Sequence, residues 1–111
     1  MVNWPAIIKH SDDPELIFVS NQSDWENNVD LHFFKYEATD YLIDSSGNIY
    51  NLREKNSSYV TPEPRGDSLS LNEILGLVKA HAAQQGSCCV AKLYAPSILE
   101  ALIIVESLNE M

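Results

Sequence analysis

The stretch YLIDSSGNIY, residues 41–50, carries the clearest local structural signal in the chain. Two β-prone segments, Asp40–Asp44 and Asn48–Leu52, flank the tripeptide at residues 45–47, which ends in Gly47. Glycine adopts a positive φ without steric cost, and a hairpin loop of three or four residues needs such a residue. The stretch therefore predicts a β-hairpin that closes at Gly47.

A second hairpin is expected near the N-terminus. The apolar segments 6–10 and 15–20 are separated by Ser-Asp-Asp-Pro at residues 11–14, which is a turn composition. Downstream, a Ser-x-x-Glu pattern occurs three times, and its two side chains satisfy free backbone N–H groups at the start of a helix. The pattern predicts helices that begin at Ser23, Ser70 and Ser97.

The remaining segments carry weaker signals. Residues 54–67 contain two prolines, one glycine and few apolar side chains, which predicts a flexible surface loop. The segment Cys88–Tyr94 has a single charge and predicts a buried strand. In the segment after Ser97, apolar residues would cover more than one side of a helix. Leu102–Val105 is therefore compatible with either a helix or a strand.

From residue 15 to residue 94, the expected order is strand, helix, strand, strand, helix, strand. This is the βαββαβ order of ferredoxin-like domains. We therefore predict a single α+β domain over residues 1–111, built as a two-layer mixed or antiparallel sheet with helices on one face. An extra N-terminal strand and a C-terminal helix complete it, and a different mixed sheet is the alternative topology.

Composition restricts the functional class. The chain has 111 residues, of which 45% are hydrophobic, enough for one core. Seven basic and sixteen acidic residues give a net charge of −9, which repels phosphate backbones and anionic lipids. The longest apolar run, residues 101–105, is far shorter than the ~20 residues that span a bilayer, and no signal peptide is visible. We expect a soluble cytoplasmic protein that binds neither nucleic acid nor membrane.

Few residues suggest chemistry. Cys88 and Cys89 are adjacent, with Cα atoms ~3.8 Å apart, too close for an unstrained disulfide. They are the candidate reactive thiols, although free cysteine usually behaves as a small buried hydrophobe. The three histidines, which a thiol would need as a base, are scattered at positions 10, 32 and 81. No catalytic, cofactor or metal site is predicted, and Asp40 and Asp44 are expected on the polar face of a strand.

Three motifs, Trp4–Ile8, Asp24–Glu26 and Tyr41–Tyr50, resemble a small bacterial family of unknown function. The resemblance extends over most of the chain. It implies a bacterial, cytoplasmic setting, and it transfers no activity, ligand or catalytic residue.

The leading functional hypothesis is a non-catalytic protein-interaction module, with a homodimer as its simplest form. The surplus of apolar residues in the last helix motivates it. The alternatives are a small enzyme or ligand carrier, and an acidic decoy that mimics DNA and occupies a DNA-binding protein. The candidate interaction surface comprises Ile98, Leu102, Ile104, Val105 and Leu108.

Overall fold

A computed structural model describes residues 2–33, 36–56, 59–86 and 90–109. Its five strands form one antiparallel sheet with the order β2-β1-β3-β4-β5. The elements in chain order are β1 (Ala6–Lys9), β2 (Leu16–Val19), α1 (Gln22–Asn27), α2 (Val29–Phe33), β3 (Tyr41–Asp44), β4 (Asn48–Asn56), β5 (Tyr59–Ser68), α3 (Leu71–Gln84) and α4 (Ile98–Asn109).

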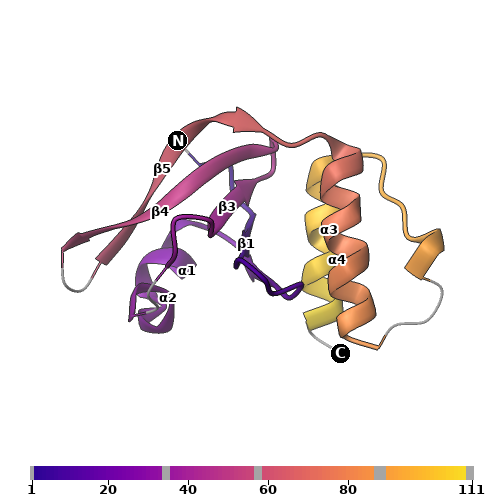
Figure 1. The fold of residues 1–111 in the computed structure, drawn as a ribbon, viewed down its shortest axis with the longest axis horizontal. Helices are drawn as coiled ribbons and strands as arrows, with labels where there is room; N and C mark the ends of the chain where they lie inside the picture. Colours follow the sequence, from indigo (N-terminus) through magenta and orange to yellow (C-terminus); the bar gives the residue numbers. More distant parts are fainter. Residues whose placement is uncertain (1, 34–35, 57–58, 87–89, 110–111) are drawn as a thin grey trace.

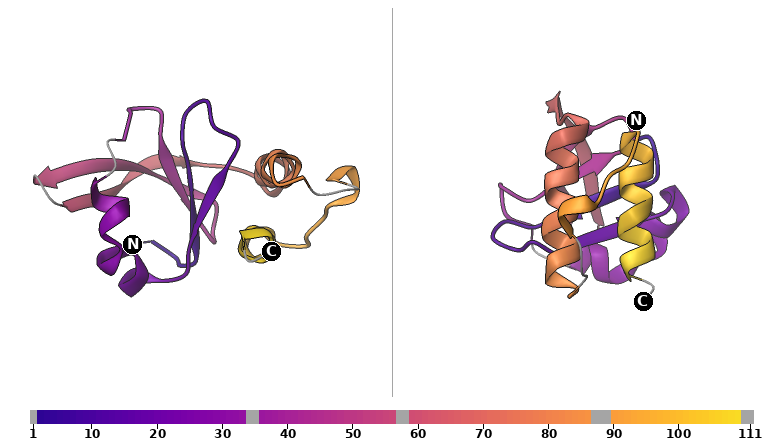
Figure 2. Two further views of the ribbon diagram at one scale, coloured as in Figure 1. Left: turned by 90° about the horizontal axis from the view of Figure 1, so that it is seen from below. Right: turned by 90° about the vertical axis from the view of Figure 1, so that its right-hand side faces the viewer.

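Helices cover both faces of the sheet (Figures 1 and 2). Side chains alternate between the faces, so Ile7 and Ile43 pack toward α3 and α4 while Ile8 and Leu42 pack toward α1 and α2. The predicted α+β class and antiparallel sheet are confirmed. Helices had been expected on one face alone; α1 and α2 occupy the other because Trp25, fully buried, anchors them there.

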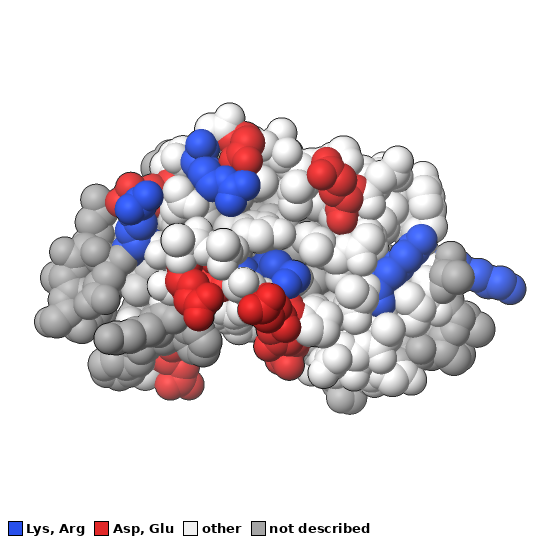
Figure 3. Space-filling model, in the orientation of Figure 1, with Lys and Arg blue, Asp and Glu red and all other residues white. Residues whose placement is uncertain are grey.

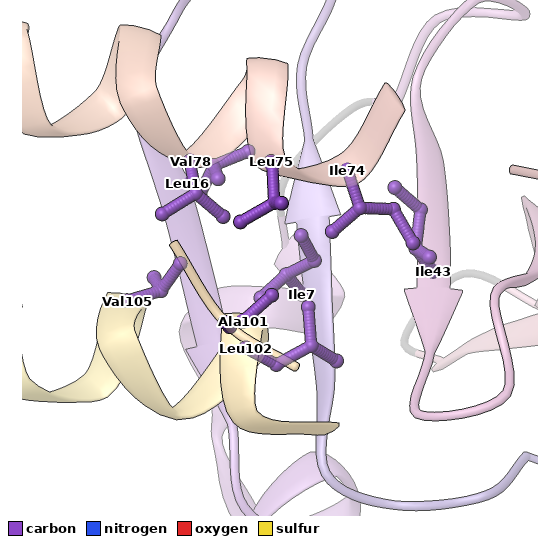
Figure 4. Packing of buried hydrophobic residues seen from close by; sticks show 10 residues of the cluster. Ile7, Leu16, Ile43, Ile74, Leu75, Val78, Ala101, Leu102 and Val105 are labelled. Carbon is purple, nitrogen blue, oxygen red and sulfur yellow. The ribbon is translucent and has the colours of Figure 1, made fainter. Parts of the chain in front are cut away.

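The larger helical layer is formed by α3 and α4, which lie side by side (Figure 2). Both helices begin near the β3–β4 turn, so they run in the same direction and a long crossover joins them. Figure 4 shows the buried residues that the two helices and the sheet contribute to this core: Ile7, Leu16, Ile43, Ile74, Leu75, Val78, Ala101, Leu102 and Val105. Leu102–Val105 is therefore helical.

Most of the local signals are confirmed. Gly47 closes the β3–β4 hairpin with φ +85°, and the N-terminal hairpin forms as β1 and β2. Ser70 begins α3 with both bonds of its capping box, and the N–H of Glu100 donates to Ser97 Oγ at 3.2 Å. The expected start at Ser23 is wrong. Asn21 caps α1, accepting from the N–H of Asp24 at 2.8 Å, because asparagine is at least as good a cap as serine.

Two segments differ from expectation. Residues 54–67 are expected as a loop, but residues 54–56 belong to β4 and residues 59–67 to β5. Pro62 and Pro64 are tolerated because β5 is an edge strand. The expected strand Cys88–Tyr94 is absent from its described part. Val90–Lys92 forms a single 3-10 turn within the crossover, which must return along the length of α3 to reach α4.

Replacing Gly47 with alanine should destabilise the fold more than the same change at Gly66. Both glycines have positive φ, +85° and +92°, so both variants carry a backbone cost of about 1–2 kcal/mol. A Cβ at Gly47 would also lie 2.6 Å from the carbonyl oxygen of Leu69, whereas one at Gly66 meets nothing within 4 Å. Urea denaturation measures both variants. Equal losses of unfolding free energy would show that the close approach to Leu69 is unimportant.

Candidate functional site

Four polar side chains are buried among the described residues, and they are the first place to look for chemistry. They are His32, Asp40, Asp44 and His81. Burying a polar group is costly unless it is hydrogen-bonded, so the partners of each reveal its role.

Asp44 is completely buried at the end of β3. Its Oδ1 accepts from the N–H groups of Ser46 and Asn48 at 2.9 and 3.0 Å. Its Oδ2 accepts from the N–H of Asn3 at 3.0 Å and from the hydroxyl of Tyr50 at 2.9 Å. Burial, together with this hydrogen bond to Asp44, raises the pKa of Tyr50 to about 12. Four donors saturate the carboxyl group, so its role is to hold the turn.

Asp40 plays the same part at the start of β3. Its Oδ1 accepts from the N–H of Ser11 at 2.6 Å, and its Oδ2 accepts from the N–H of Glu37 at 2.8 Å. Burial raises the pKa of Asp40, but these two bonds and the nearby His10 outweigh it, and the net pKa is lowered. The sequence placed Asp40 and Asp44 on a solvated strand face. Both are buried instead, because each satisfies backbone donors of neighbouring loops.

The two buried histidines each join a helix to an edge strand of the sheet. The N–H of Leu16 in β2 donates to His81 Nδ1 at 2.9 Å, and His81 Nε2 lies 2.9 Å from Asn109 Oδ1. The N–H of Val60 in β5 donates to His32 Nδ1 at 3.0 Å, and His32 Nε2 lies 2.7 Å from a backbone carbonyl of α1. Since each Nδ1 accepts a bond, each proton sits on Nε2. Both rings are therefore fully used as structural bridges.

The third histidine, His10, lies in a different environment. Its ring stacks on that of Tyr36, with centroids 5.5 Å apart and planes 9° apart, and its Nδ1 lies 3.5 Å from Asp40 Oδ2. These three residues line two cavities. One, of about 420 Å³, includes Tyr36, Asp40 and Arg53, and the other, of about 330 Å³, includes His10 and Asp13. A histidine oriented by a carboxyl group can exchange protons or bind a polar ligand.

The sequence-predicted interaction surface is divided by the structure. Leu102 and Val105 have no exposed surface and belong to the core, which is a correction, because they face the sheet from the inner side of α4. Ile98, Ile104 and Leu108 are half-buried. The candidate thiols Cys88 and Cys89 lie outside the described residues.

The exposed apolar side chains of this region are ones that the sequence analysis did not select. Leu99 and Ile103 are 44% and 40% exposed, and they lie one turn apart on the outer side of α4. Tyr94, in the crossover before α4, is 70% exposed. Their outward position follows from the inner stripe of Ala101, Leu102 and Val105, so a helical-wheel analysis with the core stripe known would have found them.

On the face of the molecule drawn in Figure 3, charged side chains of both signs occur. Figure 3 shows acidic and basic residues interspersed over the visible face. Within the described ranges, no three His, Cys, Asp or Glu residues are placed to hold a metal ion. In the same part of the chain, no helix is long and apolar enough to cross a membrane.

Comparison with known proteins places the chain in a family. The sequence model of a family described as "protein structure with unknown function" matches residues 4–105. The chain belongs to the DUF4144 family. The resemblance to an uncharacterised family that the sequence predicts is thereby confirmed.

A solved structure shares the DUF4144 fold seen here. It is the NMR structure of a protein from Shewanella amazonensis, with a TM-score of 0.69 and 24% sequence identity. The match covers 96% of this chain and 89% of that one. At this identity the likeness concerns the fold alone. No curated protein matches the chain.

Replacing Asp44 with asparagine should cost more stability than replacing Tyr50 with phenylalanine. The asparagine would turn a donating NH₂ group toward backbone N–H groups from which Asp44 now accepts, leaving part-buried donors unsatisfied, at a cost of about 2 kcal/mol. Tyr50→Phe removes one hydrogen bond, worth about 1 kcal/mol. Chemical denaturation measures both, and a smaller loss for Asp44→Asn would contradict the network.

Asp40 should contribute stability that depends on pH. Because its folded-state pKa lies below the ordinary value of 3.8, its contribution is present above that pH and is lost as the pH falls through the folded-state pKa. The difference in unfolding free energy between the wild type and Asp40→Asn should therefore shrink as the pH is lowered below about 4. Denaturation at a series of pH values tests this, and a difference that stays constant into acid would refute it.

Proposed function

We propose that this protein is a non-catalytic protein-interaction module that self-associates through the outer surface of α4. The observation that carries the proposal is the pair Leu99 and Ile103, exposed on consecutive turns of one helix. Single exposed apolar residues are ordinary, but a contiguous apolar strip is a common mark of an interface.

The neighbouring helix favours close approach of a partner. The exposed residues of α3 include Gly76, Ala80 and Ala83, which follow one another at helical spacing. Small side chains leave room for the larger ones of a facing helix. Since α3 and α4 lie side by side (Figure 2), a second copy related by a two-fold axis could place its Leu99 and Ile103 over this surface.

The non-catalytic part of the proposal is supported by the use of the buried polar groups. Asp44, His32 and His81 hold backbone atoms of the turn and of the two edge strands. Groups committed in this way are structural. A DNA-mimicking decoy receives no support from the face in Figure 3, where basic side chains interrupt the acidic ones.

A small-ligand carrier is the second candidate. The cavity of about 420 Å³ beside Asp40 and Tyr36 favours it, since that size suits a small polar molecule. A ligand there should perturb the NMR signals of Tyr36 and Asn51, which line the cavity, and leave those of α4 unchanged.

The double variant Leu99→Glu/Ile103→Glu should convert a dimer into a monomer, because two buried carboxylates per copy would be desolvated without partners. Size-exclusion chromatography with light scattering measures the mass. Val29→Glu is the matched control: Val29 is 62% exposed on α2, on the opposite side of the sheet, and its variant should remain dimeric. A wild-type protein that is monomeric at the highest attainable concentration would refute self-association.

A further inference from the structure

We propose that the edge of β2 binds an extended, basic peptide segment, which pairs with β2 as an added strand. This surface is separate from the outer side of α4, so the inference goes beyond the function proposed above. It rests on backbone groups at the sheet edge, on an adjacent groove and on the charge of the chain.

The backbone of β2 has one open position. β2 pairs with β1 and forms the edge of the sheet. Leu16 points its N–H and C=O away from β1, where they bond to His81 Nδ1 at 2.9 Å and to Asn109 Nδ2 at 3.4 Å. Alternate residues of an antiparallel strand point the same way, so the N–H and C=O of Phe18 also face outward. No described residue caps the groups of Phe18.

The two edges of the sheet are protected to different degrees. β5 carries Pro62 and Pro64, which have no N–H to offer and hinder the approach of another strand. His32 also occupies the N–H of Val60 in β5. β2 contains no proline, and its single cap at Leu16 leaves the part from Phe18 onward accessible. An added strand would therefore pair with β2.

A groove of about 310 Å³ lies beside the open edge. Its lining combines β2 with α1 and α2 and consists of Ile17, Phe18, Val19, Asp24, Asn27, Asn28 and Leu31. Side chains of an added strand would enter this groove at alternate positions. Asp24 in its wall and the net charge of −9 complement a lysine or arginine on the incoming segment.

A peptide fits this edge better than a second copy of β2. In a two-fold antiparallel pairing centred on Phe18, Ser20 of one copy would lie opposite Leu16 of the other. There His81 and Asn109 already occupy the N–H and C=O of Leu16. Self-pairing would break the bonds from Leu16 to His81 and to Asn109 in both copies. A separate peptide can end opposite Phe18 and leave these bonds intact. The occupant is therefore a heterologous extended segment.

The test uses the full chain and a capped heptapeptide that alternates valine and threonine and has a lysine at each end. On titration, the amide of Phe18 should shift in NMR spectra and gain protection from hydrogen exchange, while the amides of β5 should not. A peptide with N-methylated alternate amides should fail to bind, because it cannot complete the ladder. A peptide with glutamate in place of lysine should bind more weakly.

Charge reversal at Asp24 provides the matched variant. Asp24→Lys should weaken binding of the lysine peptide about fivefold, the size of one exposed ion pair. Glu26→Lys changes the net charge by the same amount and lies on the same helix, but outside the groove. It should alter binding by less than about twofold. The double variant Leu99→Glu/Ile103→Glu, which alters the outer side of α4, should bind the peptide as the wild type does.

Three results would overturn the proposal. They are absence of binding by the lysine peptide, equal binding of its N-methylated form, and a bound state in which the amide of Phe18 is unchanged. If Asp24→Lys and Glu26→Lys weaken binding equally, the attraction comes from overall charge and the assigned groove is wrong. None of these outcomes bears on the oligomeric state, so the failure of one proposal leaves the other standing.

Discussion

The carboxyl group of Asp44 is the interaction on which the rest of the structure depends. It is buried, and it accepts four hydrogen bonds from residues that lie in three separate segments: the N-terminal segment, the β3–β4 turn and β4. Around it, the hydroxyl of Ser45 donates to the carbonyl of Pro5 at 2.7 Å, and the N–H of Leu69 donates to the carbonyl of Gly47 at 2.9 Å. The turn thus joins the start of the chain to the segment that leads into α3.

This turn also fixes the helical layer. Gly47 approaches both the backbone of Leu69, just before α3, and the side chain of Ile98, the first residue of α4. Both helices must therefore begin at the same end of the sheet, and their parallel direction requires the long crossover. At the far end, His81 of α3 and Asn109 of α4 meet at the backbone of Leu16. The two helices are tied to the sheet at both ends.

The sequence predicts those parts of the fold that depend on near neighbours in the chain. The hairpin at Gly47 and the caps at Ser70 and Ser97 are local: Ser70 has both bonds of its capping box, and Ser97 accepts from the N–H of Glu100. The roles of Asp44 and His81 depend on partners 41 and 65 residues away, which no local pattern encodes. The strand expected over Cys88–Tyr94 shows the same limit, since composition alone does not tell a buried strand from a crossover packed on helices.

The candidate site also combines features that the sequence predicts with features that depend on distant parts of the chain. The sequence pointed to α4 because its apolar residues exceed what one core-facing stripe needs, but it could not separate Leu102, which faces the sheet, from Ile103, which faces outward. That choice depends on where α4 docks. The buried histidines and aspartates, for which the sequence predicts no catalytic or metal role, accept hydrogen bonds from backbone N–H groups at strand edges and turns. Among the described residues, the apolar pair Leu99 and Ile103 on α4 and the outward-facing backbone groups of Phe18 on β2 lie at the surface. Surface groups of those two kinds commonly bind other polypeptides.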